Sequence, residues 1–489
     1  MLNQYFAQHY KGTMIVRFDD TNPSKEKQEF EDSILEDLKL LGIVGDKLTY
    51  TSDHFDRLYE EAIKLIKLGK AYCDDTPQEQ MRHERMEGIA SKNRDRSVEE
   101  NLVEFNNMAN ATEQGTKTCL RAKISVDNPN KAMRDPVIYR CNPSIHHRTG
   151  DKYKIYPTYD FACPIVDSIE GVTHALRTIE YRDRNPQYWW MTNALGLRKV
   201  HVWDFSRLNF IRTLLSKRKL AKFVEDGLVR GWDDPRFPTV RGIRRRGMTI
   251  EALRTFILGQ GPSKNVVNLD WTIIWAGNKK VIDPIAPRFT AIIQNGAVKA
   301  KITGAPDTPV VEDKPKHKKN AEIGTKKVMF GNEILLDQED ARSFKEGEEI
   351  TLMDWGNAFV TKIVRPDPNG DVTGLELKLY LEGDFKKTEK KVTWLATGQK
   401  VVEVELVDFD YLITKDKIEE EDDVNNFINP KTEFREDAVA DCNVIDCKVD
   451  DIIQFERKGY YRCDEAAGDG KRAVFFCIPT GKAEKNEKK

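Results

Sequence analysis

The sequence, which is 489 residues long, lacks the features of several special classes of protein. No apolar run approaches the ~20 residues that a helix needs to cross a bilayer. No CxxC pair or Cys/His quartet has the spacing of a zinc site, and the formal net charge is only −2. The composition therefore argues against a membrane-spanning helix, a zinc site and a surface that binds polyanions over its whole area.

The cysteines indicate a reducing compartment. Eight are present, without the paired spacing of a metal site. Cys442 and Cys447 form a CxxxxC half-site, but no second half follows, so buried or incidental thiols are the simpler interpretation. The first residues predict an amphipathic helix rather than a signal peptide. We therefore expect a cytoplasmic protein with reduced thiols, without zinc and without a membrane partner.

Length and charge distribution predict several domains and local RNA-facing patches. A chain of 489 residues should hold three or more domains, and its hydrophobic share of 39% can supply several cores. Residues 212–246 contain eleven Lys or Arg against four acids, and KPKHKKN at 314–320 adds a second basic cluster. Local positive potential of this kind suits RNA phosphates. Ordinary solvated surface is the alternative.

The start of the chain predicts a doubly wound α/β fold. Helical patterns at 2–10, 24–41 and 52–69 flank the apolar run TMIVRF at 13–18, which is typical of a buried parallel strand. Asp19 and Asp20 follow at its carboxyl end, where ligands bind in open α/β sheets.

The stretch from Ile155 to Leu220 predicts a nucleotide-handling site. It contains IYPTYDF, GVTHALRTIEYRDRN, HVWDFSRLNF and LLSKRKL in that order. In the last of these, Lys217 can act as a point charge on phosphate oxygens and a neighbouring Arg as a fork. A short basic run alone is more typical of a solvated surface turn, so the interpretation depends on this context.

Four segments together resemble class I glutamyl-tRNA synthetases of the eukaryotic and archaeal kind, a branch close to the glutaminyl-tRNA synthetases. LLSKR at 214–218 resembles the family's KMSKS signature, RFDDTNP at 17–23 its amino-acid-binding strand end, and SRLN at 206–209 its adenosine contact. DPRFPTVRGIRRRGMT at 234–249 is also similar. The resemblance runs from Met1 to about Pro479.

The resemblance implies a multidomain protein, α/β in its first half and all-β in its second. Polar helix at 78–110 and an exposed HHRTGDK turn at 146–152 would belong to an insertion. The expected parts are a Rossmann-type catalytic domain split into 1–71 and 155–246, an acceptor-stem-binding insertion at 72–154, a helical stem-contact region at 247–283, two anticodon-binding β-barrels at 284–480, and a disordered basic tail at 481–489.

The resemblance also implies a glutamate pocket. Asp19 would bind the α-ammonium group, Tyr159 would line the pocket and Arg177 would bind the γ-carboxylate. The alternatives are a helix-capping Asp, which fits Asp20 better, a core Tyr bonded to backbone, and a surface-helix Arg paired with Glu180. A carboxylate accepts two parallel bonds from guanidinium whereas an amide offers one acceptor, so Arg177 would favour glutamate over glutamine.

Further roles follow for ATP and tRNA. Thr178, Arg207 and Leu208 would contact ATP, with Leu215 and the catalytic Ser216 and Lys217 closing on its phosphates, accompanied by Mg²⁺. No other metal is expected. The predicted tRNA contacts are Arg244, Arg245, Trp355, Asn357 and Trp394, with a core position as the alternative for each Trp.

The expected function is ATP-dependent ligation of L-glutamate to tRNA(Glu) through a glutamyl-adenylate. Glutaminyl-tRNA synthesis is one alternative. A second is a catalytically dead tRNA-binding fragment, because the family's HIGH-type signature is absent and MLNQYFAQHYKG resembles the helix that follows it. We therefore expect an amino-terminal truncation, with the missing region as a possible contact for a synthetase complex.

If this expectation holds, extending the chain upstream with a HIGH-type turn should raise ATP–pyrophosphate exchange by orders of magnitude. The reason is that such a turn supplies phosphate contacts that strengthen in the transition state. Equal exchange rates for the extended and the 489-residue chain would rule the truncation out.

Overall fold

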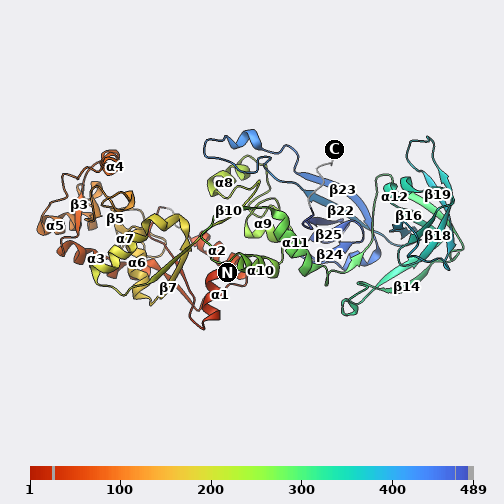
Figure 1. The fold of residues 1–489 in the computed structure, drawn as a ribbon, viewed down its shortest axis with the longest axis horizontal. Helices are drawn as coiled ribbons and strands as arrows, with labels where there is room; N and C mark the ends of the chain where they lie inside the picture. Colours follow the sequence, from red (N-terminus) through yellow and green to blue (C-terminus); the bar gives the residue numbers. More distant parts are fainter. Residues whose placement is uncertain (25–27, 469, 483–489) are drawn as a thin grey trace. The chain divides into compact units, whose positions relative to one another are not determined.

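The computed structural model describes residues 1–24, 28–468 and 470–482 (Figure 1). The chain forms two compact units. The first unit comprises Met1–Leu208 with Ile257–Val267, and the second comprises Asn209–Phe256 with the chain from Asn268 onward. Most of the tail predicted at 481–489 lies outside the described residues. Among the described residues, no helix combines the length and apolarity needed to cross a membrane.

The beginning of the first unit confirms the predicted order of helices and strands. Strands β1 and β2 pair in parallel, and Gly42 ends the second helix with a φ of +65°. β1 is half-buried rather than fully buried. The elements are α1 (Leu2–His9), β1 (Ile15–Phe18), α2 (Gln28–Leu40), β2 (Lys47–Tyr50), the 3₁₀ turn η1 (Thr51–His54) and α3 (Phe55–Lys67).

The insertion is built on a four-stranded antiparallel sheet in the order β3-β4-β5-β6. One helix was predicted at 78–110, but two are present, because Gly88 ends the first in the left-handed conformation. Its elements are β3 (Ala71–Asp74), α4 (Gln78–Glu87), α5 (Val98–Ala109), β4 (Cys119–Ala122), β5 (Val137–Cys141) and β6 (Ile155–Pro157).

The remainder of the first unit carries a second parallel pair, β7 with β8, in which Arg177 lies opposite Asp204. Helix α7 begins at Asn185, where a proline in the first turn favours a helix start. The elements are α6 (Tyr159–Ile169), β7 (His174–Thr178), the 3₁₀ helix η4 (Ile179–Arg184), α7 (Asn185–Leu195) and β8 (His201–Phe205).

One apolar core joins the four-stranded sheet and α5 to helices α3, α6 and α7 of the first unit. It includes Phe55 of α3, Phe105 of α5, Leu120 of β4, Phe161 of α6 and Met191 of α7, all almost fully buried. Burial of side chains of this size stabilises the fold by about 1.5–3 kcal/mol each.

The HHRTGDK turn is only partly exposed, although an exposed turn was predicted: Arg148, Asp151 and Lys152 are exposed, but His146 is buried. His146 is 1% exposed, and its Nε2 lies 2.7 Å from the backbone oxygen of Asp20. Its ring also stacks on Tyr156. His146 is buried because a distant part of the chain supplies its partner.

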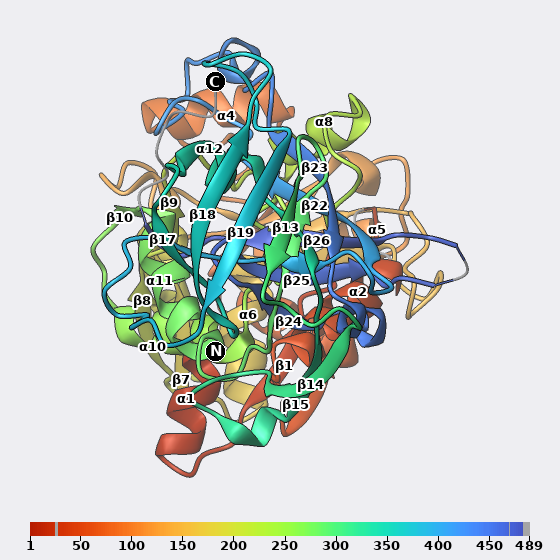
Figure 2. The ribbon, with the colours of Figure 1, turned by 90° about the vertical axis from the view of Figure 1, so that its right-hand side faces the viewer.

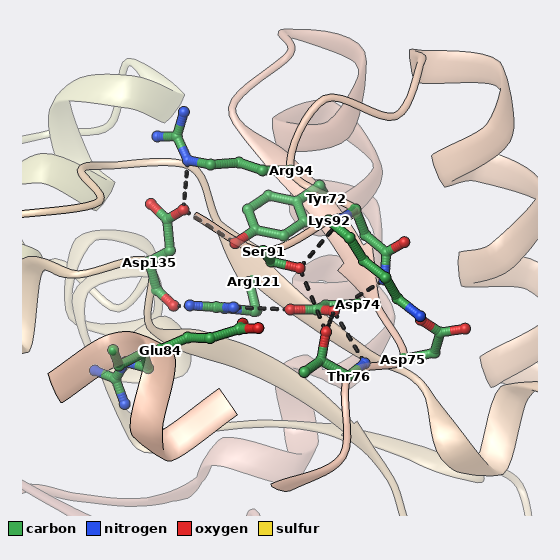
Figure 3. Close-up of polar contacts among 12 residues, drawn as sticks. Tyr72, Asp74, Asp75, Thr76, Glu84, Ser91, Lys92, Arg94, Arg121 and Asp135 are labelled. Carbon is green, nitrogen blue, oxygen red and sulfur yellow. Dashed lines mark hydrogen bonds and ion pairs between the residues drawn. The ribbon is translucent and has the colours of Figure 1, made fainter. Parts of the chain in front are cut away.

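A buried polar cluster stabilises the insertion (Figure 3). Arg121 Nη1 donates to Asp74 Oδ2 at 2.7 Å, and the two side chains are 4% and 0% exposed. Tyr72 and Arg94 both donate to Asp135. Burial alone would raise the pKa of Asp74, but hydrogen bonds from Thr76 and Arg121 outweigh it and lower this pKa.

The second unit begins with helices and continues into two mixed seven-stranded sheets, which confirms the β-rich carboxyl-terminal half. Between residues 208 and 282 the chain forms β9 (Leu208–Phe210), α8 (Lys217–Glu225), α9 (Val240–Arg245), α10 (Ile250–Gln260), β10 (Val267–Leu269) and α11 (Trp271–Ile282).

The first of these sheets has the order β20-β17-β18-β19-β13-β16-β21. Figure 2 shows β18, β19 and β13 as neighbouring arrows. Its elements are β13 (Val298–Thr303), β16 (Glu333–Leu336), α12 (Gln338–Ser343), β17 (Glu349–Leu352), β18 (Gly356–Val364), β19 (Gly374–Tyr380), β20 (Lys391–Val392) and β21 (Leu395–Ala396), with β14 (Val310–Pro315) and β15 (Thr325–Phe330) pairing as a separate ribbon.

The other sheet has the order β11-β24-β25-β26-β22-β23-β12. Two of its strands precede the first sheet in sequence and five follow it, so one sheet is nested within the other along the chain. The strands are β11 (Arg288–Phe289), β12 (Ala291–Ile293), β22 (Val402–Phe409), β23 (Glu433–Ala440), β24 (Ile452–Phe455), β25 (Gly459–Glu465) and β26 (Ala473–Ile478).

The buried ion pair of the insertion predicts a large local effect. Arg121→Met leaves the Asp74 carboxylate buried without its cation, which should cost about 3–5 kcal/mol. Amide hydrogen exchange on β3 and β4 is the appropriate measurement, because it reports local opening in a multidomain protein. Lys117→Met, which removes an exposed pair with Glu113, is the control and should change exchange by less than about 1 kcal/mol. Similar exchange in both variants would contradict this account.

Candidate active site

The first unit brings two arginines with different surroundings to the neighbourhood of α6. Arg17 of β1 donates to Asp167 and, at 2.9 Å, to Glu170 Oε2. Burial opposes the charged form of Arg17, yet these carboxylates outweigh it and raise its pKa. The charge of Arg17 is therefore compensated within the protein, and its contacts are structural.

Arg177 of β7 has neutral partners instead. Its Nη2 donates to Asn185 Oδ1 at 2.6 Å, its Nη1 lies 3.9 Å from the Cys163 sulfur, and its guanidinium lies over the ring of Tyr188 at 5.1 Å. The buried Nε has no hydrogen-bond partner. Within the described parts of the chain, no carboxylate is within 4.0 Å of this guanidinium. A carboxylate ligand would supply the missing partner.

The surface-helix alternative for Arg177 is wrong. Arg177 lies on a strand, and Glu180 pairs instead with Arg207, 2.6 Å away. Burial opposes the charged form of Arg177, but Cys163 and Tyr159 outweigh it, and its pKa lies above the ordinary value. The guanidinium is thus charged at every physiological pH.

Tyr159 and Cys163 are the further residues in contact with Arg177. Tyr159 opens α6 and is half-buried; burial raises the pKa of its hydroxyl, and a hydrogen bond with Arg177 partly offsets this. Burial also raises the pKa of Cys163 to about 12. Because the thiol stays protonated, Cys163 is a packing residue here rather than a nucleophile.

The two acidic residues after β1 have different environments. Asp19 is exposed at the carboxyl end of the strand, as predicted for a ligand-binding position. Asp20 is 1% exposed, and its Oδ1 accepts a hydrogen bond from the backbone N–H of Ser52. Asp20 therefore holds the η1 turn, whereas the sequence had favoured it as a cap of the helix that follows β1.

Arg207 and Thr178, both predicted to contact ATP, each contact the Glu180 carboxylate. The Arg207–Glu180 ion pair is 54% and 40% exposed, and a hydrogen bond from Thr178 lowers the pKa of Glu180. An exposed pair of this kind contributes about 1 kcal/mol or less, so Arg207 can exchange this partner for a ligand. Leu208 begins β9 directly after it.

The basic signature, LLSKR at 214–218, lies in the second unit, and its last two residues belong to helix α8. Ser216 is the N-cap residue of α8 and Lys217 is its first residue. Both are exposed, whereas Leu214 is 7% exposed and packs with Phe223 and Phe237. A helix start with free N–H groups suits phosphate. The structure thus anchors the loop by Leu214 and leaves its polar residues accessible.

A further group of acidic and imidazole side chains lies near Asp20. Carboxylate oxygens of Asp20 and Glu31 and a ring nitrogen of His147 lie within 4.8 Å of one another. His147 Nε2 is already 2.6 Å from Glu31 Oε1, and Arg148 lies 3.9 Å from Asp20 Oδ2. These contacts satisfy the cluster only in part, because Asp20 Oδ2, Glu31 Oε2 and His147 Nδ1 are buried without a hydrogen-bond partner.

Comparison with known proteins identifies the family. The model for the catalytic domain of class I tRNA synthetases (E and Q) matches residues 1–284, and models for anticodon-binding domains of the same synthetases match 286–380 and 391–464. The chain belongs to the class I tRNA synthetases of the E and Q type. Its fold is therefore a class I catalytic domain followed by anticodon-binding domains.

Curated relatives match almost the whole chain. The probable cytoplasmic glutamate–tRNA ligase of Schizosaccharomyces pombe is 63% identical over 99% of this chain and 67% of its own length. The cytoplasmic enzyme of Saccharomyces cerevisiae is also 63% identical, over 99% of this chain and 68% of its own length. The bifunctional glutamate/proline–tRNA ligase of Mus musculus is 49% identical over 95% of this chain and 31% of its own length.

Among solved structures, the glutamate–tRNA synthetase of Elizabethkingia anophelis is similar with a TM-score of 0.43 and 18% identity, over 58% of this chain and 67% of that one. This likeness is too low to argue from, and the family assignment rests on the sequence matches.

Within the anticodon-binding domains, two of the predicted tRNA contacts are wrong. Trp394 is 5% exposed and Asn357 is 0% exposed. The Trp394 indole donates to the backbone oxygen of Met353, and Asn357 is bonded to Thr351 and Glu349 within the sheet. Trp355 is half-buried and packs on Trp394, with ring centroids 4.7 Å apart. Trp394 is thus a core residue, the alternative that the sequence had left open.

The two arginines predicted to face tRNA are occupied within the second unit. Arg244 donates to the backbone oxygen of Met248, and Arg245 forms ion pairs with Asp464 and Asp233. Their tRNA contact stays a prediction.

The geometry of α8 predicts a rate effect at Lys217. In the upstream-extended chain, Lys217→Ala should slow adenylate formation at least about tenfold with little change in glutamate affinity, because phosphate contacts of this kind strengthen in the transition state. Single-turnover kinetics measures it. The control is Lys222→Ala on the same helix, where the ammonium contacts Asn425. Equal rates of adenylate formation in the two variants would remove Lys217 from the mechanism.

Proposed function

We propose that this chain ligates L-glutamate to tRNA(Glu) with ATP, through a glutamyl-adenylate. The observation that carries the proposal is Arg177, a half-buried guanidinium with an unpartnered Nε and only neutral contacts. The neighbouring Arg17, with two carboxylates, has no such capacity. The names of the relatives, glutamate–tRNA ligases at 63% identity, support the same substrate.

The proposed chemistry has two steps. The α-carboxylate of glutamate attacks the α-phosphorus of ATP in line and pyrophosphate leaves, and a terminal ribose hydroxyl of tRNA then attacks the adenylate. Few side chains need to exchange protons, so catalysis is mainly positioning and charge stabilisation. Mg²⁺ enters with ATP as part of the substrate.

Each residue of the proposed site has one role. Asp19 binds the α-ammonium group by a charge-assisted bond, while Tyr159 lines the pocket and Arg177 binds the γ-carboxylate. Thr178, Arg207 and Leu208 contact ATP on the side of its adenosine. Leu215, Ser216 and Lys217 stabilise the phosphates as charge moves to the leaving group.

The glutaminyl alternative is disfavoured by the same guanidinium. A γ-amide presents NH₂ donors to a group that is itself all donor, and it leaves a buried charge without a counter-charge. A purely RNA-binding role requires that the chain cannot form the adenylate, which pyrophosphate exchange tests directly.

The proposed partners are tRNA(Glu), ATP and L-glutamate, and the proposed location is the cytoplasm. The anticodon-binding domains support tRNA as a partner, and the names of the curated relatives support the location. A relative whose name joins glutamate and proline ligases supports association with another synthetase as a further proposal.

Arg177→Cys is the decisive test, in the upstream-extended chain. Removing the guanidinium should weaken glutamate use and lower the barrier against glutamine, so the glutamate-to-glutamine ratio of kcat/KM should fall at least about a hundredfold. Aminoacylation with both amino acids measures it.

The control is Arg182→Cys, which removes an exposed guanidinium from the adjoining η4 segment. It should leave the ratio unchanged. A ratio that stays the same in Arg177→Cys would mean that another residue reads the γ-group, and the glutamate assignment would lose its structural basis.

A further inference from the structure

A polar chain of three residues crosses the first unit behind the proposed glutamate pocket. Arg177 of β7 donates through Nη2 to Asn185 Oδ1 at 2.6 Å, and Asn185 Nδ2 donates to both oxygens of Asp204 on β8 at 3.1 and 2.9 Å. Asn185 and Asp204 are each 6% exposed.

The hydrogen-bonding chemistry of Arg177 and Asp204 fixes the orientation of the Asn185 amide. Guanidinium only donates and carboxylate only accepts, so the Asn185 oxygen must face Arg177 and its NH₂ group must face Asp204. One side chain therefore satisfies both neighbours at once. A hydrocarbon side chain at this position would leave Asp204 without these hydrogen bonds.

The register makes this arrangement unexpected. Arg177 and Asp204 lie directly opposite each other on adjacent parallel strands, so their side chains project from the same face. Opposite charges in such positions ordinarily pair directly. Here the amide of Asn185, from the start of α7, occupies the position between them.

The consequence is electrostatic. Arg17, which contacts two carboxylates, has its charge compensated by contact ion pairs. Arg177 is held by a strong hydrogen bond to the neutral amide of Asn185. The Asp204 carboxylate bonds to this amide and not to Arg177 itself. The guanidinium is thus oriented without a contact ion pair, which preserves its attraction for a ligand carboxylate.

We propose that Asn185 is a positioning residue for amino-acid selection: it orients Arg177 and keeps the Asp204 carboxylate out of contact with it. This inference rests on the proposed function, in which Arg177 binds the γ-carboxylate of glutamate. A direct Arg177–Asp204 pair would bind glutamate and glutamine with less difference, because the ligand charge would no longer be the main counter-charge.

The test exchanges the two side chains. Asn185→Asp combined with Asp204→Asn conserves the number of amides, carboxylates and heavy atoms, but moves the carboxylate into contact with Arg177. In the upstream-extended chain, this swap should raise KM for glutamate and lower the glutamate-to-glutamine ratio of kcat/KM at least about tenfold. The KM for ATP should stay within about threefold, because the swap leaves the ATP contacts in place.

Asp204→Asn alone is the matched control. It keeps the Asn185 oxygen on Arg177 and removes the distant charge, so the ratio should stay the same or rise. This variant also tests the proposal if the swapped protein does not fold. A tenfold fall of the ratio in Asp204→Asn would mean that the Asp204 charge itself is needed for selection, which would overturn the proposed separation.

The remaining outcomes separate this inference from the proposed function. If Arg177→Cys lowers the ratio but the swap leaves it unchanged, Asn185 is only structural and the inference fails while the function stands. If neither change moves the ratio, another residue reads the γ-group, and both fail together.

Discussion

The two ion pairs of Arg17 are the interaction on which the proposed amino-acid pocket depends. They join β1 to Asp167 and Glu170, which lie 150 and 153 residues away along the chain. Because the partners are largely buried, breaking one pair would leave an uncompensated charge in the interior. These contacts hold β1 against the carboxyl-terminal end of α6, the helix that begins at Tyr159. The insertion lies between Arg17 and Asp167 along the chain.

Charge compensation then separates Arg17 and Arg121 from Arg177. Arg17 and Arg121 have buried carboxylate partners and hold elements together. Arg177 has only neutral partners, namely an amide, a sulfur, a tyrosine hydroxyl and an aromatic ring, although Asp204 lies opposite it in the sheet. A guanidinium held in place by neutral groups is costly to bury unless a ligand supplies the missing charge. The contrast among these residues is therefore a better guide to a binding site than the presence of arginine itself.

Local patterns in the sequence predicted most helices and strands, as well as the position of Asp19 at a strand end. They could not predict Asn185 or Asp204, because the link from Asn185 to Asp204 requires the parallel register of β7 and β8. For the same reason His146 was expected on the surface, although its partner at Asp20 lies 126 residues away. The HHRTGDK turn has a polar composition, and only tertiary contacts decide whether such a turn is buried.

In the anticodon-binding domains, sequence alternation predicted strands but not their faces or pairing. A Trp in an alternating run fits either the core or an exposed stacking surface, and Trp394 is in the core, where its indole reaches a backbone carbonyl. The nesting of one sheet within the other depends on β12 pairing with β23 at positions such as Ala291 and Ala440. Such long-range pairs leave no local signal in the sequence.

The basic signature of the second unit depends on a segment that no local motif identifies. Arg212, just before the signature, has a φ of +51° and forms an ion pair with Asp416, 204 residues further along the chain. Leu412 and Ile413 from the same segment join the apolar cluster that buries Leu214. A cavity of about 200 Å³ adjoins this cluster and is lined in part by Trp271 and Tyr411.

These contacts fix the base of the signature while Ser216 and Lys217 remain exposed at the start of α8. In the proposed function, an anchored backbone lowers the entropy lost when the Lys217 ammonium closes on phosphate. The second unit thus restricts the backbone before two exposed polar side chains, whereas the first unit holds the Arg177 side chain itself in place. This difference agrees with the proposed roles, in which Arg177 selects the amino acid and Lys217 follows the phosphates.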